Sequence, residues 1–110
     1  MKIHGFKLTR KVYIDDVELS PDDSLKVRNH SPDGFNWGYG GSGPAQLALA
    51  ILMVVFNYGP ERNWDSPLLP RYQDFKWDHV SKWQGDFKVE LDPEELGKYY
   101  AFGKLGEVTA

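Results

Sequence analysis

An uninterrupted apolar segment in the middle of the chain most constrains what this sequence can fold into. The segment runs from Pro44 to Phe56, and Asp33 is the one charged residue between positions 29 and 59, although 26% of the chain is charged. Because apolar residues occupy every side of the segment, a helix formed there should be buried all round. We therefore predict a central buried helix at about 44–57, with the remaining elements packed around it.

Alternating patterns before and after this segment predict a small antiparallel sheet. Apolar residues alternate within 3–19, and Asp15 with Asp16 would form a two-residue hairpin turn, because aspartate tolerates the positive φ of such turns. Residues 86–91 alternate in the same way and predict a further strand.

Two other stretches have strand-like spacing. Leu25 and Val27 suggest a short extended segment after the first hairpins. Phe35, Trp37 and Tyr39 alternate with small or polar residues, which predicts an extended stretch with all three aromatic rings on one side.

The second half of the chain predicts two more helices. Apolar residues recur at three- and four-residue steps over 66–83, before Gly85, and a helix start at Asp92 predicts a helix over 92–102. Trp64 and Trp77 fall off the main apolar stripe, so one or both could contribute to a partner surface.

These elements predict an α+β fold: a small antiparallel β-sheet packed against two or three helices, in a single domain spanning 1–110. A chain of 110 residues has the usual size of one domain and can bury a core. The absence of cysteine excludes disulfides and thiolate metal ligands.

Composition also narrows the classes of partner. A net charge of −3 and a pI near 5.5 argue against binding to duplex nucleic acid. The apolar run is shorter than the ~20 residues that span a bilayer, and the N-terminus lacks the apolar core of a signal peptide. We expect a cytoplasmic protein without a membrane segment.

The glycine-rich loop over 38–44 is the strongest candidate site. Glycines expose backbone N–H groups, and the positive end of the following helix attracts anions. With Arg28 upstream and aromatic rings for base stacking, the loop would suit a nucleotide or another phosphate-bearing molecule. The candidate ligand contacts are Arg28, Asn29, His30, Trp37, Tyr39, Gly40, Gly41, Ser42, Gly43 and Gln46.

A structural interpretation competes with this hypothesis. The glycines could simply allow tight packing, with Ser42 capping the helix. Asn29 and His30 could hold the loop through hydrogen bonds to backbone. The loop lacks the lysine of a phosphate-binding P-loop and the strand context of a dinucleotide fingerprint.

Catalysis and metal binding are weakly indicated. An enzyme would have to use His30 with Asn29 or Ser42, and the sequence shows no residue that would orient His30 as a catalytic base. His4, His30 and His79 have no metal-like spacing. We therefore expect no cofactor and no metal, and a protein that is more simply a binder than an enzyme.

Three segments carry a resemblance to a known family. The longest segment, residues 29–48 (NHSPDGFNWGYGGSGPAQLA), resembles the signature of the DUF6166 family, which consists of small bacterial and phage proteins of unknown function. The similarity extends to residues 12–15 and 72–76. The resemblance covers most of the chain and implies no catalytic residues. Asp16 departs from the glycine expected in the hairpin. A phage or mobile-element setting is the context that the resemblance implies.

Two functional hypotheses follow. The first is a non-enzymatic binder of a phosphate-bearing small molecule at the glycine-rich loop, which in a phage setting could sequester a host signalling nucleotide against host defence. The alternative is a protein–protein interaction module or inhibitor that acts on a host protein through an exposed aromatic surface. A homo-oligomer is compatible with either hypothesis.

Overall fold

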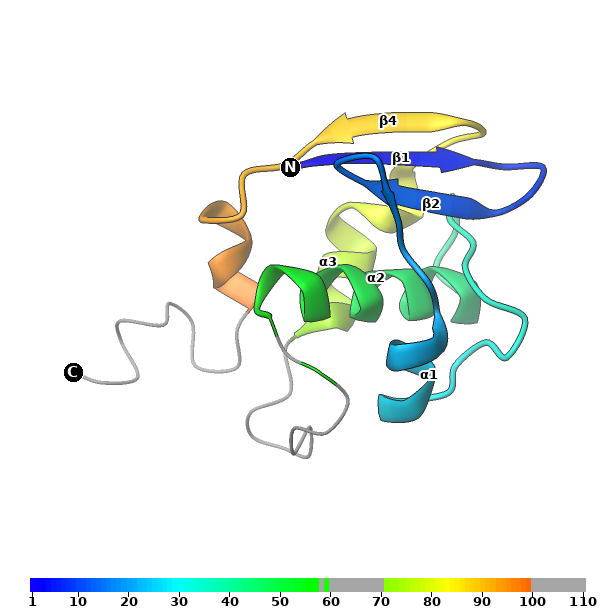
Figure 1. Cartoon of the computed structure of the whole chain (residues 1–110), viewed down its shortest axis with the longest axis horizontal. Helices are drawn as coiled ribbons and strands as arrows, with labels where there is room; N and C mark the ends of the chain where they lie inside the picture. The colour runs from blue at the N-terminus through cyan, green and yellow to red at the C-terminus, as the bar shows by residue number, and fades with distance from the viewer. Residues whose placement is uncertain (58, 60–70, 100–110) are drawn as a thin grey trace.

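The computed structural model describes residues 1–57, 59 and 71–99. Within these residues a four-stranded antiparallel sheet packs with one face on a layer of helices, which confirms the predicted α+β fold (Figure 1). The strands lie in the order β3 (Val17–Glu18), β2 (Lys11–Ile14), β1 (Lys2–Phe6) and β4 (Phe87–Glu90), so the two central strands are β1 and β2. No helix in this part of the chain is long and apolar enough to cross a membrane.

The predicted hairpins are present. β1 (Lys2–Phe6) pairs with β2 (Lys11–Ile14), and β2 pairs with β3 (Val17–Glu18). Asp15 and Asp16 have φ values of 49° and 68°, as expected for the predicted turn. β1 ends at Phe6 and buries Ile3 and Gly5, so Phe6 points to the opposite side of the sheet.

The segment around Leu25 and Val27 is a helix, so the extended assignment was wrong. α1 (Asp22–Val27) begins after Pro21, and Asp22 and Asp23 lie in its first turn, where acidic side chains favour the positive end of the helix. The Ser20 hydroxyl accepts a hydrogen bond of 3.1 Å from the backbone N–H of Asp22. These start signals outweigh the strand-like spacing of two apolar residues.

The central helix is confirmed, with slightly earlier bounds. α2 (Ser42–Val55) is buried from Gly43 to Met53 and lies beneath the sheet, with α1 on its far side and α3 crossing behind it (Figure 1). Its N-cap residue is Gly41, and no side chain caps it, so the capping role predicted for Ser42 was wrong. After the helix, Asn57 takes the left-handed conformation, with φ 54°.

The aromatic stretch before α2 is not a strand. Phe35 and Trp37 enter the core, but Tyr39 lies at the surface with 47% of its area exposed. Gly38, between the two aromatic residues, has φ 88° and donates its backbone N–H to the carbonyl of Val80. This positive φ turns the chain and ends the alternation.

The predicted helix over 66–83 is present from residue 72; its first part lies outside the described residues. α3 (Tyr72–Asp78) is followed by a short 3-10 helix, η1 (Val80–Lys82). Apolar side chains of the two elements face α2 and the sheet. The buried members of this stripe are Tyr72, Phe75, Val80 and Trp83.

The chain returns to the sheet through β4 (Phe87–Glu90), as predicted, and β4 pairs with β1 at one edge. The backbones of Met1 and Leu91 exchange hydrogen bonds of 3.0 and 2.9 Å, which extends this pairing. The helix predicted from Asp92 is a 3-10 helix, η2 (Glu95–Tyr99), in its described part. The prediction for 100–102 lies outside the described residues.

Candidate functional site

Gln46 organises the loop that precedes the glycine-rich segment. Its side chain lies wholly buried in the second turn of α2. Oε1 accepts hydrogen bonds from the backbone N–H groups of His30 and Ser31, at 2.8 and 3.1 Å, and Nε2 donates to the Ser24 hydroxyl and the Arg28 carbonyl, at 2.9 and 3.1 Å. The amide group is therefore fully engaged within the protein and holds the loop against α2.

His30 is bonded to a tyrosine rather than to Asn29 or Ser42. Its Nε2 lies 2.7 Å from the Tyr72 hydroxyl, and Asn29 is exposed. Burial lowers the pKa of His30, and the positive charges of Lys76 and Arg28 lower it further. The contact with Tyr72 holds the His30 side chain within the loop.

Trp37 cannot stack on a bound base, because its ring lies in the core. Only 1% of its area is exposed, and its indole N–H donates a hydrogen bond of 2.7 Å to the Gly85 carbonyl. The ring also packs edge-on against Phe87, with centroids 4.9 Å apart. Trp37 is a core residue that joins the loop to the start of β4. The prediction that its ring contacts a ligand was therefore wrong.

The glycine-rich loop is covered by two aromatic rings. A Cβ atom at Gly40 would overlap the ring of Trp77, and one at Gly41 would overlap the ring of Tyr39. Trp77 is 57% exposed on its outer side. The small residues are needed at these two positions so that the rings can lie on the backbone, which agrees with the packing interpretation of the loop.

Lys76 is the feature that sequence reasoning missed. Its side chain is only 7% exposed, and its ammonium group donates a hydrogen bond of 3.2 Å to the Gly40 carbonyl and lies 4.5 Å from the centroid of the Trp77 ring. Lys76 follows Tyr72 by four residues in α3, so helical spacing already placed it beside the apolar stripe.

Within the described part of the chain, the charge of Lys76 lacks a close acidic partner. Across residues 1–57, 59 and 71–99, no carboxylate oxygen lies within 4.0 Å of its ammonium group. The first turn of α2, which follows Gly40 by two residues, also contains no acidic side chain. The Lys76 ammonium group therefore lies just before the positive end of a 14-residue helix whose own first turn supplies no acidic side chain.

We call this region the α2-start face, and it consists of Tyr39, Gly40, Gly41, Ser42, Lys76 and Trp77. Ser42 and the two aromatic rings are exposed on it. Gly43 lies behind it, where an added Cβ would be 2.6 Å from the Cβ of Asn36.

An open depression of about 360 Å³ lies elsewhere, against the last turns of α2, and no residue of the α2-start face lines it.

A family model for proteins of unknown function, DUF6166, matches residues 3–101. The chain belongs to the DUF6166 family. No curated protein and no solved structure matches it. Membership in DUF6166 therefore confirms the resemblance seen in the sequence and assigns no activity. In the part of the DUF6166 chain that the structure describes, no three His, Cys, Asp or Glu side chains form a group that could hold a metal ion.

Proposed function

We propose that this DUF6166 protein is a non-enzymatic binding protein that holds a negatively charged, phosphate-bearing ligand on the α2-start face. The observation that carries the proposal is Lys76, a residue that is only 7% exposed and whose ammonium group reaches the Gly40 carbonyl just before α2. A buried charge is costly unless an opposite charge compensates it, and a bound anion beside the helix end would supply that compensation. The pKa of His30 is lowered mainly by burial, and the charges of Lys76 and Arg28 lower it further, which is consistent with a site that favours anions.

Two exposed rings extend the site beyond a simple anion contact. Tyr39 and Trp77 lie on adjacent glycines, next to the helix end. Each ring offers a free side to a flat heterocycle, so a nucleotide could place its phosphate near the amides of α2 and its base on one ring. In a protein encoded by a phage or mobile element, such a site would serve to sequester a host nucleotide.

The test is a calorimetric titration of the folded protein with sulfate, inorganic phosphate, nucleoside monophosphates and triphosphates, and free nucleosides. We expect heat from the anions, stronger binding of nucleotides, and no measurable binding of nucleosides. Lys76→Met should weaken anion binding at least tenfold, and the matched control Lys82→Met, which removes an exposed lysine from η1, should not. Absence of binding by every anion, or equal binding by both variants, would refute the proposal.

A second candidate is favoured by the exposure of Tyr39 and Trp77. Exposed aromatic side chains are frequent anchors of protein interfaces, and here two of them lie beside Lys76 at the start of α2, where a partner protein could dock. Affinity capture from a host lysate should then recover one protein that is lost with Trp77→Ala and displaced by sulfate. Trp64, the other tryptophan considered for this role, lies outside the described residues.

A further inference from the structure

β4 forms an open edge of the sheet. It pairs with β1 on one side, and the strand order places no described strand on its other side. The opposite edge, β3, has only two residues, so β4 is the longer of the two edges. In Figure 1 β4 lies along the upper border of the molecule. An edge of this kind presents backbone N–H and C=O groups that can pair with another strand.

The backbone groups of Lys88 and Glu90 point toward this open side. Leu91 exchanges two backbone hydrogen bonds with Met1, and bonded pairs alternate along an antiparallel ladder. The backbone of Val89 therefore also bonds to β1, whereas the backbones of Lys88 and Glu90 are directed away from it. Among the described residues, no further strand takes up these donors and acceptors.

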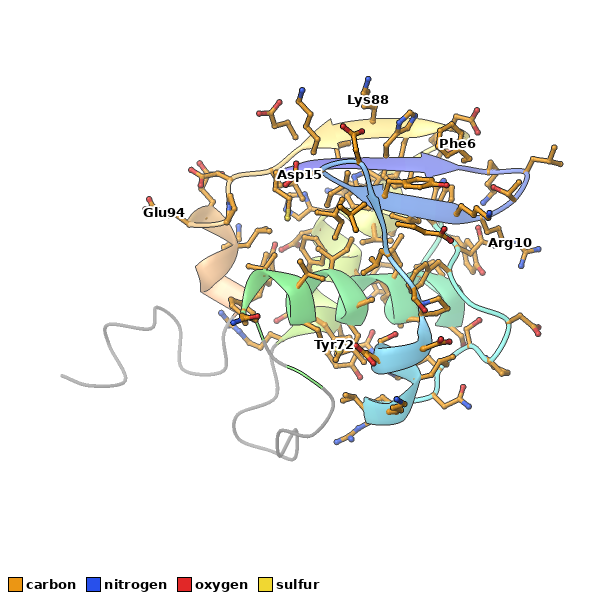
Figure 2. The ribbon with its side chains drawn as sticks, in the orientation of Figure 1. Phe6, Arg10, Asp15, Tyr72, Lys88 and Glu94 are labelled. Atoms are coloured by element: carbon orange, nitrogen blue, oxygen red, sulfur yellow. The ribbon has the colours of Figure 1, made fainter. Side chains whose placement is uncertain are left out.

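The side chains of this edge divide between the two faces of the sheet. Lys88 and Glu90 are exposed on the outer face, where they lie opposite His4 and Lys2 of β1. In Figure 2 the labelled Lys88 projects from the sheet on the side opposite α2. Val89 faces the helices and packs against the core, but it is only partly buried. The edge therefore combines two opposite charges with an apolar residue that an added strand would cover.

From this edge we propose that two copies of the chain pair through β4, antiparallel and related by a two-fold axis at Val89. In this register Lys88 of each copy lies opposite the partner's Glu90. Both residues direct their backbone groups to the added strand, so each pair exchanges two backbone hydrogen bonds. The same contacts occur twice, as a two-fold axis requires, and the two sheets become one continuous sheet.

Charge selects this register over its neighbours. A shift of two residues in one direction places Lys88 opposite the partner's Lys88, and a shift in the other direction places Glu90 opposite the partner's Glu90. Like charges directly opposite each other destabilise a sheet. In the proposed register, Glu90 lies between Lys2 of its own chain and the partner's Lys88. A lysine on an edge usually discourages pairing with other strands, and here a second copy supplies the acid that it needs.

The ends of the paired segment keep the contact short. Asp86 and the partner's Asp92 would oppose each other, but each carboxylate already accepts a backbone hydrogen bond in its own chain. The donors are Lys7 at 2.8 Å and Glu94 at 3.0 Å. Pro93 has no N–H to donate, so pairing stops before it. Because so short a contact buries little surface, we expect a reversible dimer that dissociates on dilution.

The proposal is independent of the anion site. Lys88 and Glu90 do not belong to the α2-start face, so Lys76→Met should leave the dimer intact. In the same way, a variant that abolishes the dimer should bind sulfate as the wild type does. Failure of one proposal therefore does not decide the other.

The experiment is sedimentation velocity on the whole chain between about 10 µM and 1 mM, the range in which weak association is measurable. We expect a fraction of dimer that rises with concentration. Lys88→Glu and Glu90→Lys should each weaken the dimer about tenfold or more, because each creates two like-charge pairs. Lys26→Glu and Glu18→Lys make the same charge changes at exposed positions outside β4 and are the matched controls. Circular dichroism confirms that each variant is folded.

Mixing the two β4 variants gives the sharper result. Lys88→Glu has two acidic residues on the edge, and Glu90→Lys has two basic ones. Each variant alone should be monomeric, but their equimolar mixture should form a heterodimer, because every acid then lies opposite a lysine of the other chain. A general effect of net charge would not require these two positions, and the mixture of the two control variants should associate no better than the wild type.

A disulfide tests the position of the two-fold axis. The chain has no cysteine, so Val89→Cys introduces a single thiol. Residues at such a non-hydrogen-bonded position have Cα atoms about 4.5 Å apart, within the range that a disulfide spans. Mild oxidation should therefore link two copies of Val89→Cys. Val17→Cys, at a 70% exposed position on the other edge, is the control and should link much more slowly.

Three results would overturn the proposal. The first is a wild-type chain that stays monomeric over the whole concentration range. The second is association that the β4 variants change no more than their controls do, or that mixing of the β4 variants does not restore. The third is a folded Val89→Cys variant that forms a disulfide no faster than Val17→Cys.

Discussion

The ring of Trp77 lies directly on the backbone of Gly40, so closely that no side chain fits between them. The same glycine accepts a hydrogen bond from Lys76, the neighbour of Trp77 in α3. Two consecutive residues of α3 therefore hold the chain just before α2, one through its ring and the other through its charge. The shape of the α2-start face depends on this contact, which also fixes the position of the Lys76 charge.

Gly40→Ala should destabilise the protein by about 1–3 kcal/mol, because the new methyl group forces Trp77 out of its position. Removal of the ring should relieve this cost. In a double-mutant cycle, Gly40→Ala combined with Trp77→Ala should cost less than the sum of the single changes, as measured by urea denaturation. Strictly additive costs would show that the ring does not rest on the glycine.

Gln46→Leu should destabilise the protein by about 2–4 kcal/mol. The apolar side chain fits a helix but leaves the N–H groups of His30 and Ser31 without their acceptor. Gln84→Leu, at an exposed position, is the control and should change stability little. Chemical denaturation measures both, and a Gln46→Leu effect no larger than the control effect would contradict the role assigned to this side chain.

Stability should fall as the pH drops below about 6.5, the ordinary pKa of histidine. The pKa values of His30 and His79 are lowered in the folded protein, for both mainly by burial. The unfolded chain therefore binds more protons in this range, and folding becomes less favourable as the pH falls. Thermal melts between pH 7.5 and 5 should show this loss.

The double variant His30→Gln with His79→Gln serves as the control for this pH dependence. It should melt at a temperature that changes much less between pH 7.5 and 5. If the double variant loses as much stability as the wild type over this range, the pH dependence comes from carboxyl groups and not from the two histidines.

Sulfate should bind more tightly as the pH falls through the same range. A bound anion favours the protonated form of His30, so binding takes up a proton and the affinity rises. Sulfate keeps its charge over this range, so the change belongs to the protein. Calorimetry at several pH values provides the measurement, and an equal rise in His30→Gln would exclude His30 as its source.

The parts of the fold that follow from local chemistry could be predicted from the sequence. The helix α2 is apolar on all sides, and such a helix is buried in the core of a folded domain. The turn at Asp15 and Asp16 likewise needs only residues that accept positive φ. α1 was missed because Leu25 and Val27 are spaced as in a strand, although Pro21 and its following acidic residues start a helix.

The sequence located the loop of the candidate site but not all of the side chains that surround it. The glycine-rich loop could be located, but alternation placed Trp37 beside Tyr39, and the positive φ of Gly38 sends the two rings in different directions. Which tryptophan covers the loop depends on how α3 packs on α2, and that is a tertiary contact. Lys76 had a visible signal, because it lies four residues after Tyr72 on the inward side of α3.

The central claim is that the start of α2 attracts an anion. The most direct measurement is an NMR titration of the isotope-labelled protein with sulfate and then with a nucleoside monophosphate, with the amide signals of Gly40, Gly41, Ser42 and Gly43 followed. We predict saturable shifts concentrated at these four amides, with the same apparent dissociation constant, and their loss in Lys76→Met. Shifts that spread evenly over the chain, or amides of the loop that do not respond, would contradict the claim.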